Sequence, residues 1–168
     1  MDREAIDYWK RRTEEQRLLD YWRAVSQVEG RIDRAYFSSG PGAALLSELS
    51  EKDKRRVIDI LVDIQVPRSH LEGLTKIRTK RHSWEYMGSA FTGCYEHTEG
   101  LIYVDSSWPD HIFRATLVHE LGHHQDHAFF EKLQLNRKRS GETIADFYEV
   151  WWNGSPKEKE TIKKFLGI

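Results

Sequence analysis

Hydrophobic positions recur at helical spacing in two segments before Pro67. Residues 3–29 carry apolar side chains every three or four positions between charged ones, which predicts a helix. These apolar side chains are Leu18, Trp22, Val25 and Val28. Ser50, with Asp53 three positions later, resembles the pair of capping side chains that begins a helix. A second amphipathic helix is predicted from there to Val66, because Pro67 cannot continue it.

After residue 67 the pattern changes from helical to alternating. Residues 74–79 alternate and are rich in β-branched side chains, which predicts a strand. Residues 84–95 are aromatic and contain small residues, whereas residues 97–100 form a plausible turn before the apolar strand 101–104. Together these segments predict a small sheet, mixed or mostly antiparallel, with a hairpin.

Helical spacing returns in the last third of the chain. Asp110 follows Pro109 and is predicted to cap a largely buried helix of about 20 residues. A polar, basic loop follows and ends at Gly141. Helices are predicted over residues 142–152 and 157–165. The apolar positions of the 20-residue helix that follows Pro109 are Ile112, Ala115, Leu117, Val118, Leu121 and Phe129.

The order of these elements predicts an α+β fold, with an N-terminal helical region at 1–66 and a second region at 67–168, the two forming one compact unit. The length of 168 residues suits one domain, or one domain with a helical appendage. Hydrophobic residues make up 39% of the chain and include six Trp, which is enough to build a packed core.

Charge and cysteine content exclude several classes of protein. The 26 basic and 27 acidic residues nearly cancel, and neither half is strongly basic, so no nucleic-acid or membrane partner is indicated. The only cysteine, Cys94, excludes an internal disulfide and is most typical of a small buried hydrophobe. The charged start has no apolar signal segment, and no stretch approaches 18 apolar residues, so a cytoplasmic location is expected.

The chemistry of the chain is concentrated in His119-Glu120-Leu121-Gly122-His123, an HExxH motif. On a helix, His119 and His123 lie one turn apart on the same face, where two imidazoles can bind one zinc ion. Glu120 lies about 100° around the helix, close enough to act as a base toward a water on the metal. The motif therefore predicts two ligands and a general base.

A catalytic zinc needs a third protein ligand. His127 lies about 12 Å beyond His119 along the helix axis, too far for the same ion, and Asp126 rises away from the metal. The third ligand should therefore come from another helix, and Glu142 is the best candidate. Its alternative role is that of an ordinary first-turn carboxylate favoured by the helix dipole.

Asp146 lies one helical turn after Glu142 and shares its face. It is predicted to accept a hydrogen bond from the second ring nitrogen of a ligand histidine, which would fix the tautomer and orientation of that ring. The alternative is a solvated surface aspartate.

The HExxH motif, followed after 18 residues by Glu142-x-x-x-Asp146, resembles the gluzincin pattern of thermolysin-like zinc metallopeptidases. In that family the Glu is the third ligand and the Asp supports the first His. The strand motif at 93–95 with 102–105, together with the helix at 117–126, is similar to compact anthrax lethal factor-like and clostridial proline-specific endopeptidases. These resemblances imply a zincin-like fold and cover about residues 90–152.

The chain departs from two relatives of that pattern. Metzincins place Gly and His where Asp126 and Phe129 stand, and the lethal factor-like group has a Tyr shortly before its ligand Glu that this chain lacks. The residue that would stabilise the oxyanion is therefore unassigned, with Tyr148, Arg137 and Arg139 as candidates.

Other residues near the motif have structural interpretations. His124 is expected to be structural because it points about 140° away from His119 on the helix. His127 is expected at the surface, with a place in the cleft as its alternative. Trp151 and Trp152 are expected in the core.

The predicted function is that of a zinc metallopeptidase that hydrolyses a peptide or protein substrate, held along a sheet edge near residues 91–95. A second hypothesis is a regulatory peptidase with one specific partner. A short N-terminal resemblance of residues 8–12 to phage minor head proteins implies a virion-associated protein. A third hypothesis is a non-catalytic binding module that zinc stabilises, although a structural site needs no general base.

Overall fold

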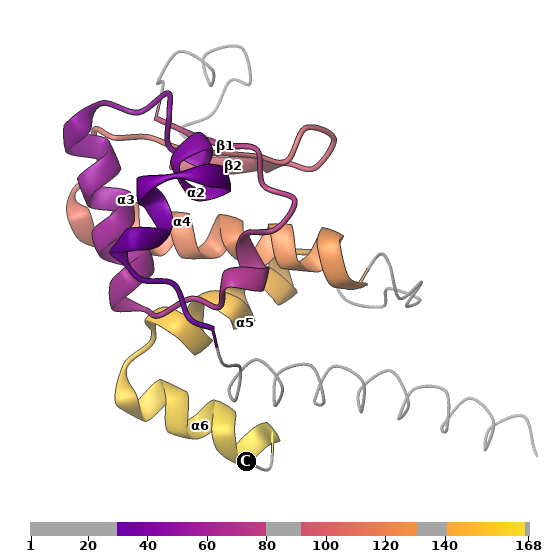
Figure 1. The fold of residues 1–168 in the computed structure, drawn as a ribbon. Coiled ribbons are helices and arrows are strands. Elements are labelled where there is room, and N and C mark those ends of the chain that lie inside the picture. Colours follow the sequence, from indigo (N-terminus) through magenta and orange to yellow (C-terminus); the bar gives the residue numbers. More distant parts are fainter. Residues whose placement is uncertain (1–29, 80–91, 131–140, 167–168) are drawn as a thin grey trace, which may run out of the picture.

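A computed structural model describes residues 30–79, 92–130 and 141–166, and the helix predicted at 3–29 lies outside them. The described fold is α+β, as predicted, with helices before and after a small sheet (Figure 1). Its elements are η1 (Arg34–Ser38), α2 (Gly40–Leu45), α3 (Glu51–Asp63), η2 (Arg68–Leu71), β1 (Lys76–Arg78), β2 (Gly93–Glu96), β3 (Leu101–Val104), α4 (Asp110–Gln125), the π-helical turn η4 (Asp126–Phe130), α5 (Gly141–Asn153) and α6 (Pro156–Leu166).

Helix α3 begins as the sequence predicts. The Ser50 hydroxyl accepts a hydrogen bond from the backbone N–H of Asp53 at 3.1 Å, which satisfies a donor of the first turn. The helix ends at Asp63, three residues before the predicted end. The chain turns there because Gln65 adopts a positive φ of 53°, and the carbonyl of Val66 then accepts a hydrogen bond from the backbone N–H of Ile32.

The described sheet has the strand order β1-β3-β2. β2 and β3 form the predicted antiparallel hairpin, whereas β1 pairs with β3 in parallel. The described strands therefore form a mixed sheet, which is one of the two arrangements that the sequence predicts. The physical reason lies at the hairpin turn, where the carbonyl of Gly100 accepts a hydrogen bond from the backbone N–H of Thr75 at 2.9 Å. This hydrogen bond places the start of β1 beside the start of β3, so the two strands run in the same direction.

Helix α4 and its π-helical extension together match the predicted long, buried helix, with Phe113, Leu117 and Val118 inaccessible to solvent. The predicted role of Asp110 as the cap is wrong. Pro109 occupies the cap position, and the Asp110 carboxylate instead accepts a hydrogen bond from Arg56 Nε at 3.1 Å.

One hydrophobic core joins the early helices to the rest of the described chain. Buried side chains from Ile32 to Val66 belong to the same cluster as those from Leu71 to Trp152. Trp151 and Trp152 lie in this core, as expected. None of the helices that the structure describes combines the length and the apolar character needed to cross a bilayer.

His70 is a buried polar residue within this core. Its Nδ1 lies 2.9 Å from the hydroxyl of Tyr148, and its backbone carbonyl accepts a hydrogen bond from Gln125. Burial, with smaller contributions from the neighbouring His124 and Arg31, lowers the pKa of His70 to about 3. The imidazole is therefore neutral in the folded protein at neutral pH.

Acid should destabilise the fold through His70. A histidine whose folded pKa lies below its unfolded value gives full stability above about pH 6.5 and loses it as the pH falls toward the folded pKa. Between pH 7 and pH 5 we expect the free energy of unfolding to fall by about 2 kcal/mol from this residue alone, measured by urea denaturation. In a His70→Gln variant the loss over this pH range should be smaller; an equal loss would assign the effect to other groups.

Candidate metal centre

Gly122, inside the HExxH motif, allows α5 to lie directly against α4. A Cβ atom at this position would lie 2.7 Å from the Cα atom of Ala145 and 2.9 Å from the Cβ atom of Tyr148, closer than real Cβ atoms come. Arg114 contacts Asn153 farther along, so the two helices run antiparallel, as Figure 1 shows them side by side. The motif therefore faces the helix that carries the predicted acidic residues.

The two histidines of the motif lie on one face of α4. The ring centroids of His119 and His123 are 5.0 Å apart, with an angle of 79° between the ring planes. Two imidazoles that bind one tetrahedral zinc through nitrogens about 2.0–2.1 Å from the metal would have centroids roughly 5 Å apart. Their spacing therefore suits two ligands of a single zinc ion.

Glu120 is buried beneath the start of β2. A Cβ atom on Gly93 would lie 3.6 Å from Glu120 Cγ and 2.4 Å from Thr116 Cγ2, so the absence of a side chain lets β2 pass close to α4. Among the described strands, β2 is the outer strand of the sheet on this side. The side chain of the predicted base thus lies between α4 and β2, the strand at one edge of the described sheet.

Glu149, which the sequence interpretation did not include, reaches the site from α5. Its Oε2 atom lies 3.5 Å from Nδ1 of His119. The signal was present in the sequence, because Glu149 follows Glu142 by seven residues and so returns to nearly the same helix face. It was hidden by the Glu142-x-x-x-Asp146 pattern, which supplied an acidic partner already.

Glu142 and Asp146 both lie on α5, where the sequence predicts a helix. Their side chains lie outside the description, so their predicted roles stay predictions. Among the described side chains, no three of the types His, Cys, Asp and Glu converge to hold a metal ion.

His124 has the structural role expected of it. Its Nε2 lies 2.6 Å from the carbonyl oxygen of Glu72, so this nitrogen donates, and Nδ1 then accepts a hydrogen bond from the Tyr95 hydroxyl at 2.9 Å. The buried imidazole thereby links β2 to α4 and to the turn before β1.

His127 is half-buried rather than fully exposed. Its ring stacks on that of His97 at 4.6 Å and also contacts the ring of Tyr95 at 5.6 Å. These contacts pack η4 against the end of β2 and the hairpin turn, and the place of His127 in a cleft stays a prediction.

The structure removes one of the three residues that could stabilise the oxyanion. Tyr148 is fully buried and its hydroxyl contacts His70, so it does not face the side of α4 that carries Glu120. Arg137 and Arg139 lie outside the described residues.

Cys94 is not an active thiolate, because burial raises its pKa to about 11, with smaller contributions from Glu120 and Glu96.

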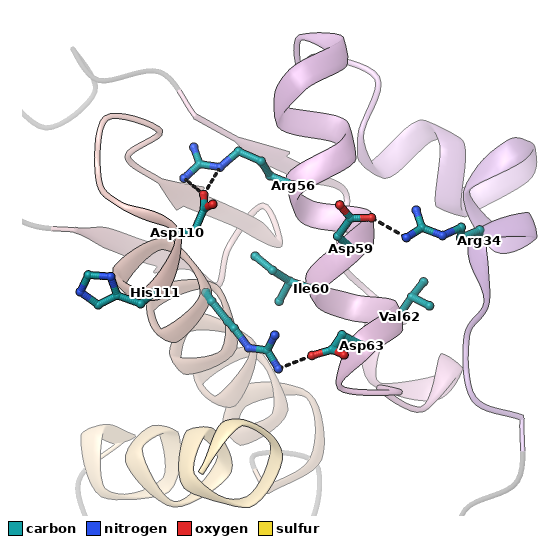
Figure 2. Close-up of a pocket in the computed structure, with 9 residues that line it drawn as sticks. Arg34, Arg56, Asp59, Ile60, Val62, Asp63, Asp110 and His111 are labelled. Atoms are coloured by element: carbon teal, nitrogen blue, oxygen red, sulfur yellow. Dashed lines mark hydrogen bonds and ion pairs between the residues drawn. The ribbon is translucent and has the colours of Figure 1, made fainter. Parts of the chain in front are cut away.

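A separate pocket of about 620 Å³ lies between α3 and the start of α4 (Figure 2). Each of its three arginines forms an ion pair with an aspartate, so the pocket offers no unbalanced charge. These ion pairs connect α3 to η1 and to α4, and they involve none of the residues of the HExxH motif. The pairs are Arg34–Asp59, Arg56–Asp110 and Arg114–Asp63.

No known protein family, curated protein or solved structure matches the chain.

Proposed function

We propose that this protein is a zinc-dependent metallopeptidase with a zincin-like arrangement of the gluzincin type. The observation that supports this most is the arrangement of the HExxH turn. Its two imidazoles have a spacing that suits one zinc ion. Its glutamate is buried beside β2, the edge strand of the described sheet. We propose His119, His123 and Glu142 as the metal ligands. When bound, zinc would polarise the scissile carbonyl and acidify the attacking water.

The proposed reaction assigns each step to a residue of the chain. Glu120 takes a proton from the attacking water and returns it to the nitrogen of the leaving amine. Its burial favours this role, because a buried carboxylate held by its neighbours keeps a fixed position relative to the attacking water. An extended peptide alongside β2 would bring its scissile bond close to Glu120, since β2 passes directly over that residue.

Two other functions remain as alternatives to a general endopeptidase. A regulatory or virion-associated peptidase would use the same residues on one specific partner. A binding module stabilised by zinc would keep the ligands without needing Glu120. The buried carboxylate next to the ligand pair favours catalysis over that module, because burial of a charged group costs free energy that a structural zinc site does not require.

Metal content tests the proposal first. Protein purified without added zinc should contain about one zinc ion per chain, as expected for a single three-ligand catalytic site. A Glu142→Ala variant should lose most of this metal, measured by elemental analysis, because two imidazoles alone bind zinc weakly. Glu99→Ala, in the hairpin turn, is the matched control and should keep its zinc.

The outcomes separate the hypotheses. A full zinc complement in Glu142→Ala would move the third ligand to another residue, with Asp146 and Asp126 to be tested next. Wild-type protein that binds no zinc, even after zinc is added back, would contradict the peptidase function.

A further inference from the structure

The approach of α5 to the first histidine of the motif has a consequence for the metal site. The acidic side chain described next to His119 is that of Glu149, with Oε2 3.5 Å from Nδ1. Both side chains are mostly shielded, with exposed fractions of 20% for His119 and 31% for Glu149. A carboxylate at this distance from an imidazole nitrogen, in a partly shielded place, favours a proton on that nitrogen.

Helix packing explains why Glu149 reaches this point. Gly122 lies against Ala145 and Tyr148, so α5 approaches α4 with this face. Glu149 follows Ala145 by one helical turn and Tyr148 by one residue, and antiparallel packing carries it back along α4 from Gly122 toward His119. Asp146 lies about 100° around the helix from Ala145, farther from the line of closest contact.

We propose that Glu149 is the positioning residue of the zinc site, the carboxylate that orients His119. This inference rests on the proposed function. Glu149 would accept the Nδ1 proton of His119, which fixes the tautomer with a lone pair on Nε2, the nitrogen left to bind the metal. The orienting role, not the ligand role, is assigned to Glu149 because its Oε2 lies 3.5 Å from Nδ1 of His119, a ring nitrogen that can donate to it.

This assignment differs from the pattern in the sequence, which gives the supporting role to Asp146. The two carboxylates are three residues apart on α5, so their roles can be separated by single substitutions. Zinc alone is a sufficient probe, because an orienting carboxylate changes metal affinity even when no substrate is present.

The test compares Glu149→Gln, Glu149→Ala and Asp146→Asn, with Glu99→Gln as a control away from the site. Zinc affinity is measured by competition with a chromophoric chelator, and the tautomer of His119 by ¹⁵N NMR of its ring nitrogens. We expect both Glu149 variants to bind zinc about 10–100-fold more weakly than the wild type. The zinc-free His119 ring should lose its preference for the proton on Nδ1. Asp146→Asn should change neither measurement.

Helical circular dichroism of each zinc-free variant shows whether the fold is kept, and the NMR result in the glutamine variant does not depend on metal. Wild-type zinc affinity in both Glu149 variants would overturn the assignment. A 10–100-fold loss confined to Asp146→Asn would overturn it in favour of Asp146. Complete loss of zinc in Glu149→Gln would make Glu149 a ligand instead. If the wild type binds no zinc, the proposed function and this inference both fail.

Discussion

A Glu120→Gln variant should bind zinc and fold as the wild type does but lose peptide hydrolysis by a factor of about 10²–10⁴. The amide of glutamine has nearly the shape of the carboxylate and fills the same buried place beneath Gly93. It cannot take a proton from water, however, so only the proton transfer is removed. Cleavage of a denatured protein mixture, followed by mass spectrometry of the products, measures this activity without knowledge of the natural substrate.

Glu99→Gln provides the matched control for this variant. Glu99 is exposed in the turn between β2 and β3, outside the strand that would hold the substrate. Its substitution removes one negative charge without touching the HExxH turn and should leave cleavage unchanged. Hydrolysis that survives in Glu120→Gln would contradict a role for Glu120 as the base. Zinc binding without hydrolysis in the wild type would favour the binding-module alternative.

Gly122→Ala should destabilise the protein, although glycine-to-alanine changes inside helices are usually favourable. Helix propensity alone predicts a gain of about 1 kcal/mol in the free energy of unfolding. The added methyl group would, however, lie 2.7 Å from the Cα atom of Ala145 and 3.0 Å from its carbonyl oxygen, and backbone atoms cannot move aside cheaply. We expect a net loss of about 1–3 kcal/mol, as for other overpacked cores, measured by urea denaturation.

The same change should weaken the metal site, because separation of α4 from α5 moves every acidic residue of α5 away from His119 and His123. Gly122→Val should have the larger effect on both stability and zinc affinity. Ala115→Ser adds one heavy atom at a half-buried position of α4 and is a suitable control. An increase in stability in Gly122→Ala would show that α5 does not pack against Gly122 as described.

Local sequence patterns were sufficient for the elements whose stability is local. The Ser50 hydroxyl and the backbone of Asp53 are three residues apart, so their hydrogen bond could be predicted from the chain alone. The hairpin of β2 and β3 likewise depends on a short turn, in which Gly100 adopts a positive φ of 66°. The long helix at 110–130 followed from its apolar spacing.

Contacts between distant segments could not be predicted in the same way. Asp110 was expected to cap its own helix, but Arg56, 54 residues away in the sequence, binds its carboxylate. The sequence also left the direction of β1 open between a mixed and an antiparallel sheet, because the bond from Thr75 to Gly100 joins residues 25 apart. Such interactions depend on how elements meet in space, and single-chain periodicity carries no information about this.

The candidate chemistry of this protein follows from three positions in the chain. The spacing of His119, Glu120 and His123 places two imidazoles and a carboxylate on one helical turn, whatever the rest of the chain does. The packing of the elements sets which residues surround that turn. The missing side chains of Gly93 and Gly122 allow β2 and α5 to approach α4, and the packing of α5 brings Glu149 to His119. Helical periodicity gives the face on which a side chain lies, but only packing determines what that face contacts.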